Sequence, residues 1–191
     1  MEMIRSTVEH LKTYLEIQVP IRYEDTWFRE LRSRFSNSPV RWQKGYYHIT
    51  MAFINETPKG VDMRPILERH LSSAVAPRVV FDRLDAFSIN QGKYIIHLAT
   101  SHVPEEFLSL TESIRADMKD VGCVIYSDFL LHVTLGRIYS SDVELSDIME
   151  VLDKITMPPI TLTLTDMDYR LYRGRTLFET RLNDGKSRRD D

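Results

Sequence analysis

Hydrophobic and polar residues along this chain recur with two different periods. Residues 14–20 (YLEIQVP) alternate at every second position, which is typical of a half-buried strand. Residues 24–36 instead place four large apolar side chains at the three- and four-residue spacing of a helix. Two other apolar stretches, residues 46–54 and 129–138, look like buried strands but each carries a histidine and a threonine. The pattern therefore predicts a chain that mixes strands and helices.

The predicted elements follow nearly the same order twice, as β-α-β-α-β and then β-α-β-α-β-β. His48 and His132 are 84 residues apart, and the glycines of two predicted turns, Gly92 and Gly174, are 82 apart. This is a repeat of pattern, which predicts two similar lobes related by a pseudo-two-fold axis. Further helices are expected from Met63, from Pro104 and over 142–155, and further strands over 78–89, 93–99, 160–172 and 176–182.

We therefore expect an α+β fold built from duplicated β-α-β units. Two sheets of antiparallel type are expected to face a central cleft, with the helices outside. No linker separates the two halves, so residues 1–182 are expected to form a single bilobal domain. The polar residues 183–191 lack periodicity and are expected to be a flexible tail.

Composition narrows the class of protein. The chain has 191 residues, of which 42% are hydrophobic and 28% charged, as is normal for a domain with a sizeable core. The formal net charge of −3 argues against binding of long nucleic acid over the whole surface, but it allows a small phosphate ligand or an RNA end in a locally basic cleft. No apolar run approaches about 20 residues, and the first residues resemble no signal peptide. The lone Cys123 excludes an internal disulfide, so a cytoplasmic protein without membrane contact is expected.

The first histidine and threonine pair should lie on one face of its strand. Side chains two apart on a strand point the same way, so His48 and Thr50 share a face while Ile49, Met51 and Phe53 are expected on the buried face.

The second pair repeats this arrangement. His132 and Thr134 share a face, and Arg137, an odd number of residues from His132, is expected to point the other way. If the lobes face each other, two imidazoles and two hydroxyls converge on one point.

Such a set suits phosphoester chemistry. A neutral histidine accepts a proton from the attacking oxygen while the other, protonated, gives one to the leaving oxygen. The threonine hydroxyls donate to the charged phosphate oxygens. The Ile and Val next to the two histidines supply no carboxylate that would suggest a dinuclear metal site, so no metal or other cofactor is expected. A histidine in a strand is more often an ordinary packed residue, and a single His-x-Thr triplet means little. Two copies at the same place in a repeated unit are stronger grounds.

The stretches YYHITMAFI (46–54) and FLLHVTLGRI (129–138) resemble the motifs of the 2H phosphoesterase superfamily, in particular its bacterial and archaeal RNA 2′,3′-cyclic phosphodiesterases, also called 2′–5′ RNA ligases. The resemblance extends over about residues 13–182. It implies a metal-independent phosphodiesterase that acts on 2′,3′-cyclic phosphates or 2′–5′ linkages. It also implies that His48 and His132 are catalytic and that Thr50 and Thr134 contact the phosphate.

Other residues are candidates for substrate contact beside the two motifs. Tyr46 has the parity of His48, and Tyr169, Arg170 and Tyr172 lie on a strand that the repeat places beside the cleft. Aromatic rings and a guanidinium there suit stacking on a base, although an ordinary edge strand explains them equally. The expected partners are RNA ends, oligonucleotides or nucleotides with a cyclic phosphate. The alternative function is a binding module that holds such a ligand without turnover.

Overall fold

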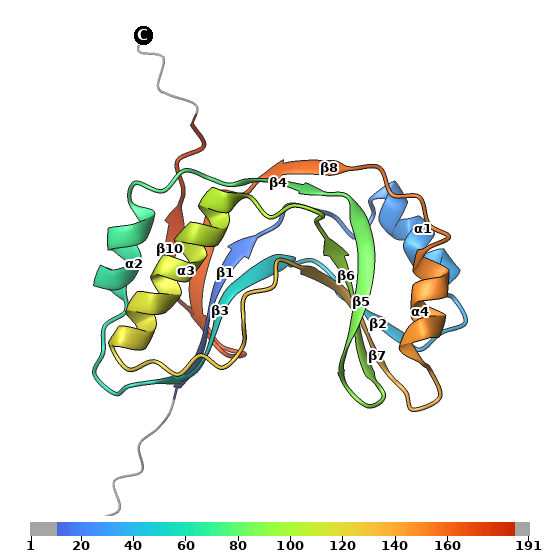
Figure 1. Cartoon of the computed structure of the whole chain (residues 1–191), viewed down its shortest axis with the longest axis horizontal. Helices are drawn as coiled ribbons and strands as arrows, with labels where there is room; N and C mark the ends of the chain where they lie inside the picture. The colour runs from blue at the N-terminus through green and yellow to red at the C-terminus, as the bar shows by residue number, and fades with distance from the viewer. Residues whose placement is uncertain (1–10, 186–191) are drawn as a thin grey trace, which may run out of the picture.

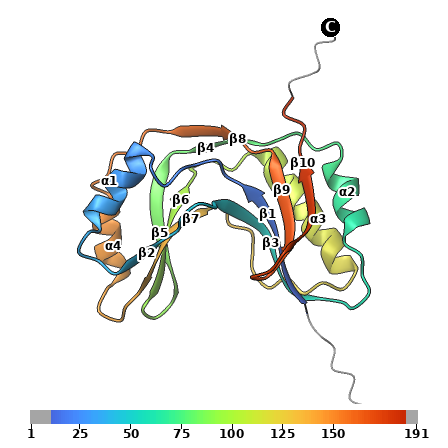
Figure 2. The ribbon, with the colours of Figure 1, turned by 180° about the vertical axis from the view of Figure 1, so that it is seen from behind.

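The described residues, 11–185 of a computed structural model, form an arch with two arms (Figure 1). Each arm is an antiparallel four-stranded sheet with two helices on its outer side, and a two-stranded ribbon joins the arms across the top. The view from behind shows the same arrangement, with α2 and α3 at one end and α1 and α4 at the other (Figure 2). The predicted α+β class, with antiparallel sheets and outer helices, is confirmed.

The first sheet has the strand order β10-β9-β1-β3. Its outer face is covered by two helices, which leaves the face with the first motif directed toward the other arm (Figure 1). The strands are β1 (Leu11–Gln18), β3 (His48–Thr57), β9 (Asp166–Leu171) and β10 (Thr176–Arg181), and the helices are α2 (Arg64–Leu71) and α3 (Glu105–Asp120).

The second sheet has the strand order β2-β7-β6-β5, and the second motif lies at the start of its inner strand β7, with His132 directly before the strand. Two further helices cover its outer side (Figure 2). The strands are β2 (Val40–Trp42), β5 (Arg83–Asn90), β6 (Lys93–Ala99) and β7 (Val133–Tyr139), and the helices are α1 (Thr26–Arg34) and α4 (Leu145–Leu152).

Each sheet combines strands from both halves of the sequence. In the first sheet, β1 of the first half pairs with β9 of the second half. In the second sheet, β2 and β5 of the first half pair with β7 and β6 of the second half. Each arm therefore contains strands from both halves of the sequence, and neither arm corresponds to one half of the chain. This exchange ties the two arms together.

Two of the predicted strands are each broken in two, which is a correction. The stretch 78–89 forms β4 (Arg78–Phe81) and β5, and the stretch 160–172 forms β8 (Ile160–Thr163) and β9. The physical reason is a change of pairing partner. Strands β4 and β8 pair with each other in the ribbon, after which β5 joins the second sheet and β9 joins the first. The break before β5 falls at Asp82, whose Oδ1 accepts a hydrogen bond of 2.9 Å from the N–H of Ser101.

Local signals explain where the long helix begins and ends. Helix α3 follows Pro104, has Glu105 and Glu106 in its first turn, and is followed by Gly122 with a φ of +91°. Acidic side chains favour the positive end of the helix dipole, and glycine tolerates a positive φ. Its apolar face packs into a core that continues beneath both sheets.

Both motif strands contain a β-bulge at the same place. In β3, Leu15 pairs with Ala52 and Glu16 with Thr50, so Met51 is the extra residue. In β7, Ile96 pairs with Gly136 and His97 with Thr134, so Leu135 is the extra residue. A bulge adds one residue to one strand and reverses the alternation of side chains beyond it. The residues that directly follow each bulge therefore face opposite to the expectation from simple parity.

The sequence predicts that the folded domain ends at residue 182 and that residues 183–191 form a flexible tail. Asn183, its first residue, is hydrogen bonded through its backbone to Ala74 and Ala76 and so belongs to the folded part. The rest of the tail stays a prediction, and residues 186–191 lie outside the described residues, as do residues 1–10. Within residues 11–185, every helix is too short or too polar to cross a membrane.

Candidate active site

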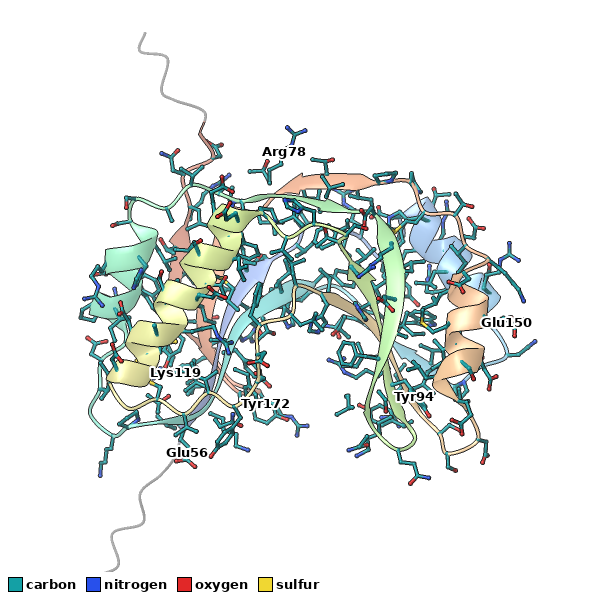
Figure 3. The ribbon with its side chains drawn as sticks, in the orientation of Figure 1. Glu56, Arg78, Tyr94, Lys119, Glu150 and Tyr172 are labelled. Atoms are coloured by element: carbon teal, nitrogen blue, oxygen red, sulfur yellow. The ribbon has the colours of Figure 1, made fainter. Side chains whose placement is uncertain are left out.

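The concave side of the arch holds a cleft of about 860 Å³. Both sheets contribute to its lining, and Figure 3 shows side chains from the two arms directed into the space between them. The four motif residues predicted to converge all line this cleft: His48, Thr50, His132 and Thr134.

The two bulges bring two further side chains into the cleft, and both correct an expectation from the sequence. Phe53 was expected on the buried face, yet it lines the cleft and its ring stacks on Tyr14 with centroids 4.7 Å apart. Arg137 was expected to point away from His132, yet it also lines the cleft and donates a hydrogen bond of 3.2 Å to Gln43 Oε1. Neither extra residue is signalled by the hydrophobic pattern of its strand.

His132 is held by its own backbone and by aromatic neighbours. Its Nδ1 lies 2.9 Å from the carbonyl oxygen of Leu130, so a proton on Nδ1 is donated there and Nε2 keeps its lone pair. The rings of Phe87 and His97 contact it edge-on, at centroid distances of 5.3 and 5.5 Å. Burial is the main cause that lowers the pKa of His132, and the charge of Arg137 lowers it further. At neutral pH its imidazole is therefore neutral, with a free nitrogen to accept a proton.

His48 has a different environment. Its Nε2 lies 3.2 Å from Oε1 of Glu16, while its buried Nδ1 has no hydrogen-bond partner among the described residues. Burial lowers the pKa of His48 to about 4, and the nearby charges of Arg137 and His132 act in the same direction. His132 is therefore near enough to His48 to influence its pKa.

Glu16 belongs to a buried polar network behind His48. Only 4% of Glu16 is exposed, and burial raises the pKa of its carboxyl to about 7. The hydroxyl of Tyr46 lies 3.3 Å from Glu16 Oε2 and 3.0 Å from Asp168 Oδ2. Asp168 also accepts a hydrogen bond of 2.8 Å from Gln18. The charge of Arg170 opposes the rise in the pKa of Glu16.

The outer candidates divide by strand parity. Tyr46, Arg170 and Tyr172 line the cleft, and Figure 3 labels Tyr172 near the open end of its arm. Tyr169 does not line it, which corrects the expectation. Its side chain is buried on the other face of the sheet, between Thr13 and Thr57, because odd and even positions of β9 face opposite ways.

The two sides of the cleft have the same strand pairing and bulge beside the motif, but they differ in their side chains. The residue opposite Thr50 is Glu16, and the residue opposite Thr134 is His97. The side with His48 carries tyrosines and Arg170, whereas the side with His132 carries an apolar wall. This wall consists of Phe87, Ile89, Ile95 and Leu130.

Sequence reasoning missed Glu16, Asp168 and Phe87. A signal existed for the first: Glu16 and Gln18 are polar at alternate positions of an otherwise apolar strand, the same pattern as in the His-x-Thr motifs. Asp168 gave no such signal, because only the pairing of β9 with the distant β1 brings it beside Tyr46. Phe87 gave none either, because it reaches the cleft through β6, which pairs with the motif strand β7.

Metal-ligating side chains do not cluster in the described part of the chain. Across residues 11–185, no group of three or more His, Cys, Asp and Glu side chains is placed to hold a metal ion.

Comparison with known proteins supports the fold. No family model matches the sequence, and no curated protein matches it. Among solved structures, the chain is similar to Usb1 of Kluyveromyces marxianus, with a TM-score of 0.65 and 9% identity, covering 91% of this chain and 99% of Usb1. It is also similar to E. coli LigT complexed with 3′-AMP, with a TM-score of 0.59 and 19% identity, covering 91% and 99% of the two chains.

A third similar structure is TT0787 of Thermus thermophilus, with a TM-score of 0.55 and 16% identity, covering 92% of this chain and all (100%) of that one. These neighbours are 2H phosphoesterases. At such identities the similarity establishes the fold, and the resemblance seen in the two motifs is confirmed at that level.

Proposed function

We propose that this protein is a metal-independent phosphodiesterase that acts on RNA ends or nucleotides carrying a 2′,3′-cyclic phosphate or a 2′–5′ linkage. The observation that carries the proposal is the convergence of His48 and His132, from different sheets, on one cleft that Thr50 and Thr134 also line. A pair of imidazoles beside paired hydroxyl donors supplies an acid, a base and ligands for a phosphate without further groups.

The reaction needs one neutral and one protonated imidazole. One histidine accepts a proton from water, the resulting hydroxide attacks phosphorus, and the bond to one ribose oxygen breaks while the other histidine gives that oxygen a proton. Both histidines have lowered pKa values in the free protein. A bound phosphate anion favours the protonated form of a neighbouring imidazole, so binding itself supplies the charged acid.

The lining of the cleft suits a nucleotide. A volume of about 860 Å³ lies in the range of small-molecule sites. The guanidiniums of Arg137 and Arg170 are near enough to lower the pKa of His48, and they provide positive charge for a phosphate. Tyr46 and Tyr172 offer rings on which a base can stack. Structures of E. coli LigT complexed with 3′-AMP, ATP and phosphate support a ligand of this class.

A non-catalytic binding module is the second candidate. The observation in its favour is that His48 Nε2, the nitrogen needed to give a proton, already contacts Glu16. In this case the same residues hold a nucleotide and no bond breaks. For both candidate functions we propose a cytoplasmic protein that needs no cofactor, as the sequence predicts.

The test is a panel of substrates. Purified protein is incubated with the four nucleoside 2′,3′-cyclic phosphates, a 2′–5′-linked dinucleotide and a 3′,5′-cyclic nucleotide, with and without EDTA. We expect turnover of the first two kinds, insensitive to EDTA, with a bell-shaped pH profile of kcat/KM. Binding of these compounds without any product selects the binding module, and activity that EDTA abolishes and metal restores contradicts the proposed mechanism.

A further inference from the structure

The two histidines of the cleft have different neighbours on the adjacent strand. Opposite Thr50 lies Glu16, whose Oε1 is 3.2 Å from His48 Nε2. Opposite Thr134 lies His97, whose ring packs against that of His132 with centroids 5.5 Å apart. A carboxyl group therefore contacts one histidine at the position where an imidazole contacts the other.

The hydrogen bonds around Tyr46 indicate that Glu16 carries a proton. The hydroxyl of Tyr46 has a single proton but lies within hydrogen-bond distance of two carboxyl oxygens, on Glu16 and Asp168. The shorter of the two contacts, at 3.0 Å, goes to Asp168. Tyr46 therefore donates to Glu16 only over the longer contact of 3.3 Å, which gives a carboxylate there little support. Burial with so little donor support favours the protonated carboxyl, and a proton on its Oε1 lies at the 3.2 Å contact with His48 Nε2.

Burial favours the uncharged form of both side chains of the pair. The side chains of Glu16 and His48 are 5% and 24% exposed, and burial raises the pKa of Glu16 to about 7 and lowers that of His48 to about 4. Between these pH values the pair holds one ionisable proton, which stays on Glu16 in the free protein. The titratable and charged groups around the pair are Tyr14 on β1, Tyr46 before β3, Asp168 and Arg170 on β9, and His132 and Arg137 on β7.

We propose that Glu16 stores the proton that His48 uses as general acid, and that the two histidines therefore have fixed roles, with His132 as the base. This inference rests on the proposed function. It agrees with the tautomer of His132, whose Nδ1 is engaged with Leu130 and whose Nε2 is left to accept a proton.

The protons balance over one turnover. When the phosphate anion binds, the carboxyl proton of Glu16 passes to His48 and leaves a carboxylate beside an imidazolium. His132 takes a proton from water, the hydroxide forms a bond to phosphorus, and His48 gives its proton to the leaving ribose oxygen. His132 then releases its proton to solvent, and the Glu16–His48 pair takes one up. The net change is the addition of one water molecule.

The inference is tested first without any turnover, by the number of protons taken up when inorganic sulfate binds at pH 6. Titration calorimetry in buffers of different ionisation enthalpy gives this number. In the wild type the proton that charges His48 comes from Glu16 and not from solvent. Glu16→Gln keeps the shape of the side chain but removes the carboxyl proton. We therefore expect this variant to take up about one more proton from solvent per bound sulfate than the wild type does. Glu179→Gln, an exposed glutamate on β10 of the same sheet, is the control and should match the wild type.

The second readout is the pH profile of kcat/KM with a 2′,3′-cyclic nucleotide. The alkaline limb of the wild type reports loss of the stored proton, and in Glu16→Gln it reports His48 alone. We expect the limb to move to lower pH by at least about one unit, so that the activity of the variant relative to the wild type falls by at least about tenfold between pH 5 and pH 7.5. A purely structural role of Glu16 would lower activity equally at all pH values.

Equal proton uptake and an unshifted limb in Glu16→Gln would overturn the role of Glu16 and leave the phosphodiesterase proposal standing. Absence of turnover in the wild type, together with the extra proton in Glu16→Gln, would reject the enzyme and keep the proton store. If Glu16→Gln fails to fold, ¹⁵N spectra of wild-type His48 decide instead. Sulfate at pH 6 should convert its imidazole from the neutral to the charged form, and an imidazole that stays neutral contradicts the inference.

Discussion

Arg115 donates a hydrogen bond of 3.0 Å from Nη1 to the main-chain carbonyl of Met51, across 64 residues of sequence. Met51 is the extra residue of the bulge directly after Thr50. The other guanidinium nitrogen of Arg115 donates to the carbonyl of Ser127, in the loop that leads to His132. One buried side chain of α3 therefore fixes the backbone next to both motifs.

Replacement of Arg115 by methionine should destabilise the protein markedly. Arg115 is only 8% exposed, and its loss removes two charge-assisted hydrogen bonds and leaves the buried carbonyl of Met51 without this donor. We expect a loss of about 2–3 kcal/mol in the free energy of unfolding, measured by urea denaturation. Lys119→Met, at an exposed position of the same helix, is the matched control and should change stability by less than about 0.5 kcal/mol. Equal stabilities of the two variants would show that the contacts with Met51 and Ser127 contribute nothing.

Sulfate should bind to the cleft more tightly as the pH falls. Both histidines have lowered pKa values in the free protein, so they are neutral at pH 7. An anion that binds beside them favours their charged forms, and below pH 7 the proton of His48 comes from Glu16, so uptake from solvent reports His132. Between pH 7.5 and 5 the affinity should rise by up to about tenfold per pH unit for each proton taken up from solvent. Sulfate keeps its charge over this range, so calorimetry isolates the protein groups. An affinity independent of pH would mean that the anion does not draw a proton onto His132.

Arg137 should be needed for binding of the anion, because the bulge at Leu135 turns its guanidinium into the cleft. Arg137→Met removes a charge that already acts on both histidines, and we expect sulfate affinity to fall by about tenfold or more. Arg29→Met, at an exposed position of α1, serves as the control with unchanged affinity. If the two variants bind sulfate equally well, the phosphate site does not include Arg137.

Glu16→Gln should stabilise the protein at alkaline pH. The pKa of Glu16 is raised from 4.5 to about 7 on folding, so the folded state favours the protonated carboxyl. The stability from this preference is present in full below about pH 4.5 and is lost as the pH rises through 7. Glutamine cannot ionise, so the variant should gain up to about 3 kcal/mol relative to the wild type between pH 4 and pH 8. Urea denaturation at both pH values measures this gain, and a constant difference between the two proteins would contradict the raised pKa.

Periodicity predicted most of the fold because the helices and strands bury one face each. The helix from Pro104 and the motif strand from His48 are found where the pattern places them. The breaks at Asp82 and before Asp166 escaped prediction, since they depend on which distant strand becomes the partner. The exchange of strands between the arms escaped for the same reason.

The candidate site was predictable only up to the bulges. Parity placed His48 with Thr50 and His132 with Thr134, and all four line the cleft. Beyond them the extra residue in each strand reversed the parity, so the side chains that follow face opposite to expectation. A bulge is set by packing between paired strands and leaves no mark in a single sequence. The buried carboxyl beside His48 was signalled only by the alternation of Glu16 and Gln18, because strand register decides that it lies next to His48.

The central claim is that His48 and His132 act together on one phosphate, and single and double alanine variants test it most directly. Turnover of a nucleoside 2′,3′-cyclic phosphate is measured for His48→Ala, His132→Ala, the double variant and His102→Ala, an exposed control. We predict that each cleft variant loses about 10²–10⁴ in kcat, that the double variant is little worse than the poorer single one, and that the control keeps full activity. Losses that multiply in the double variant, or turnover that survives without both imidazoles, would contradict the account.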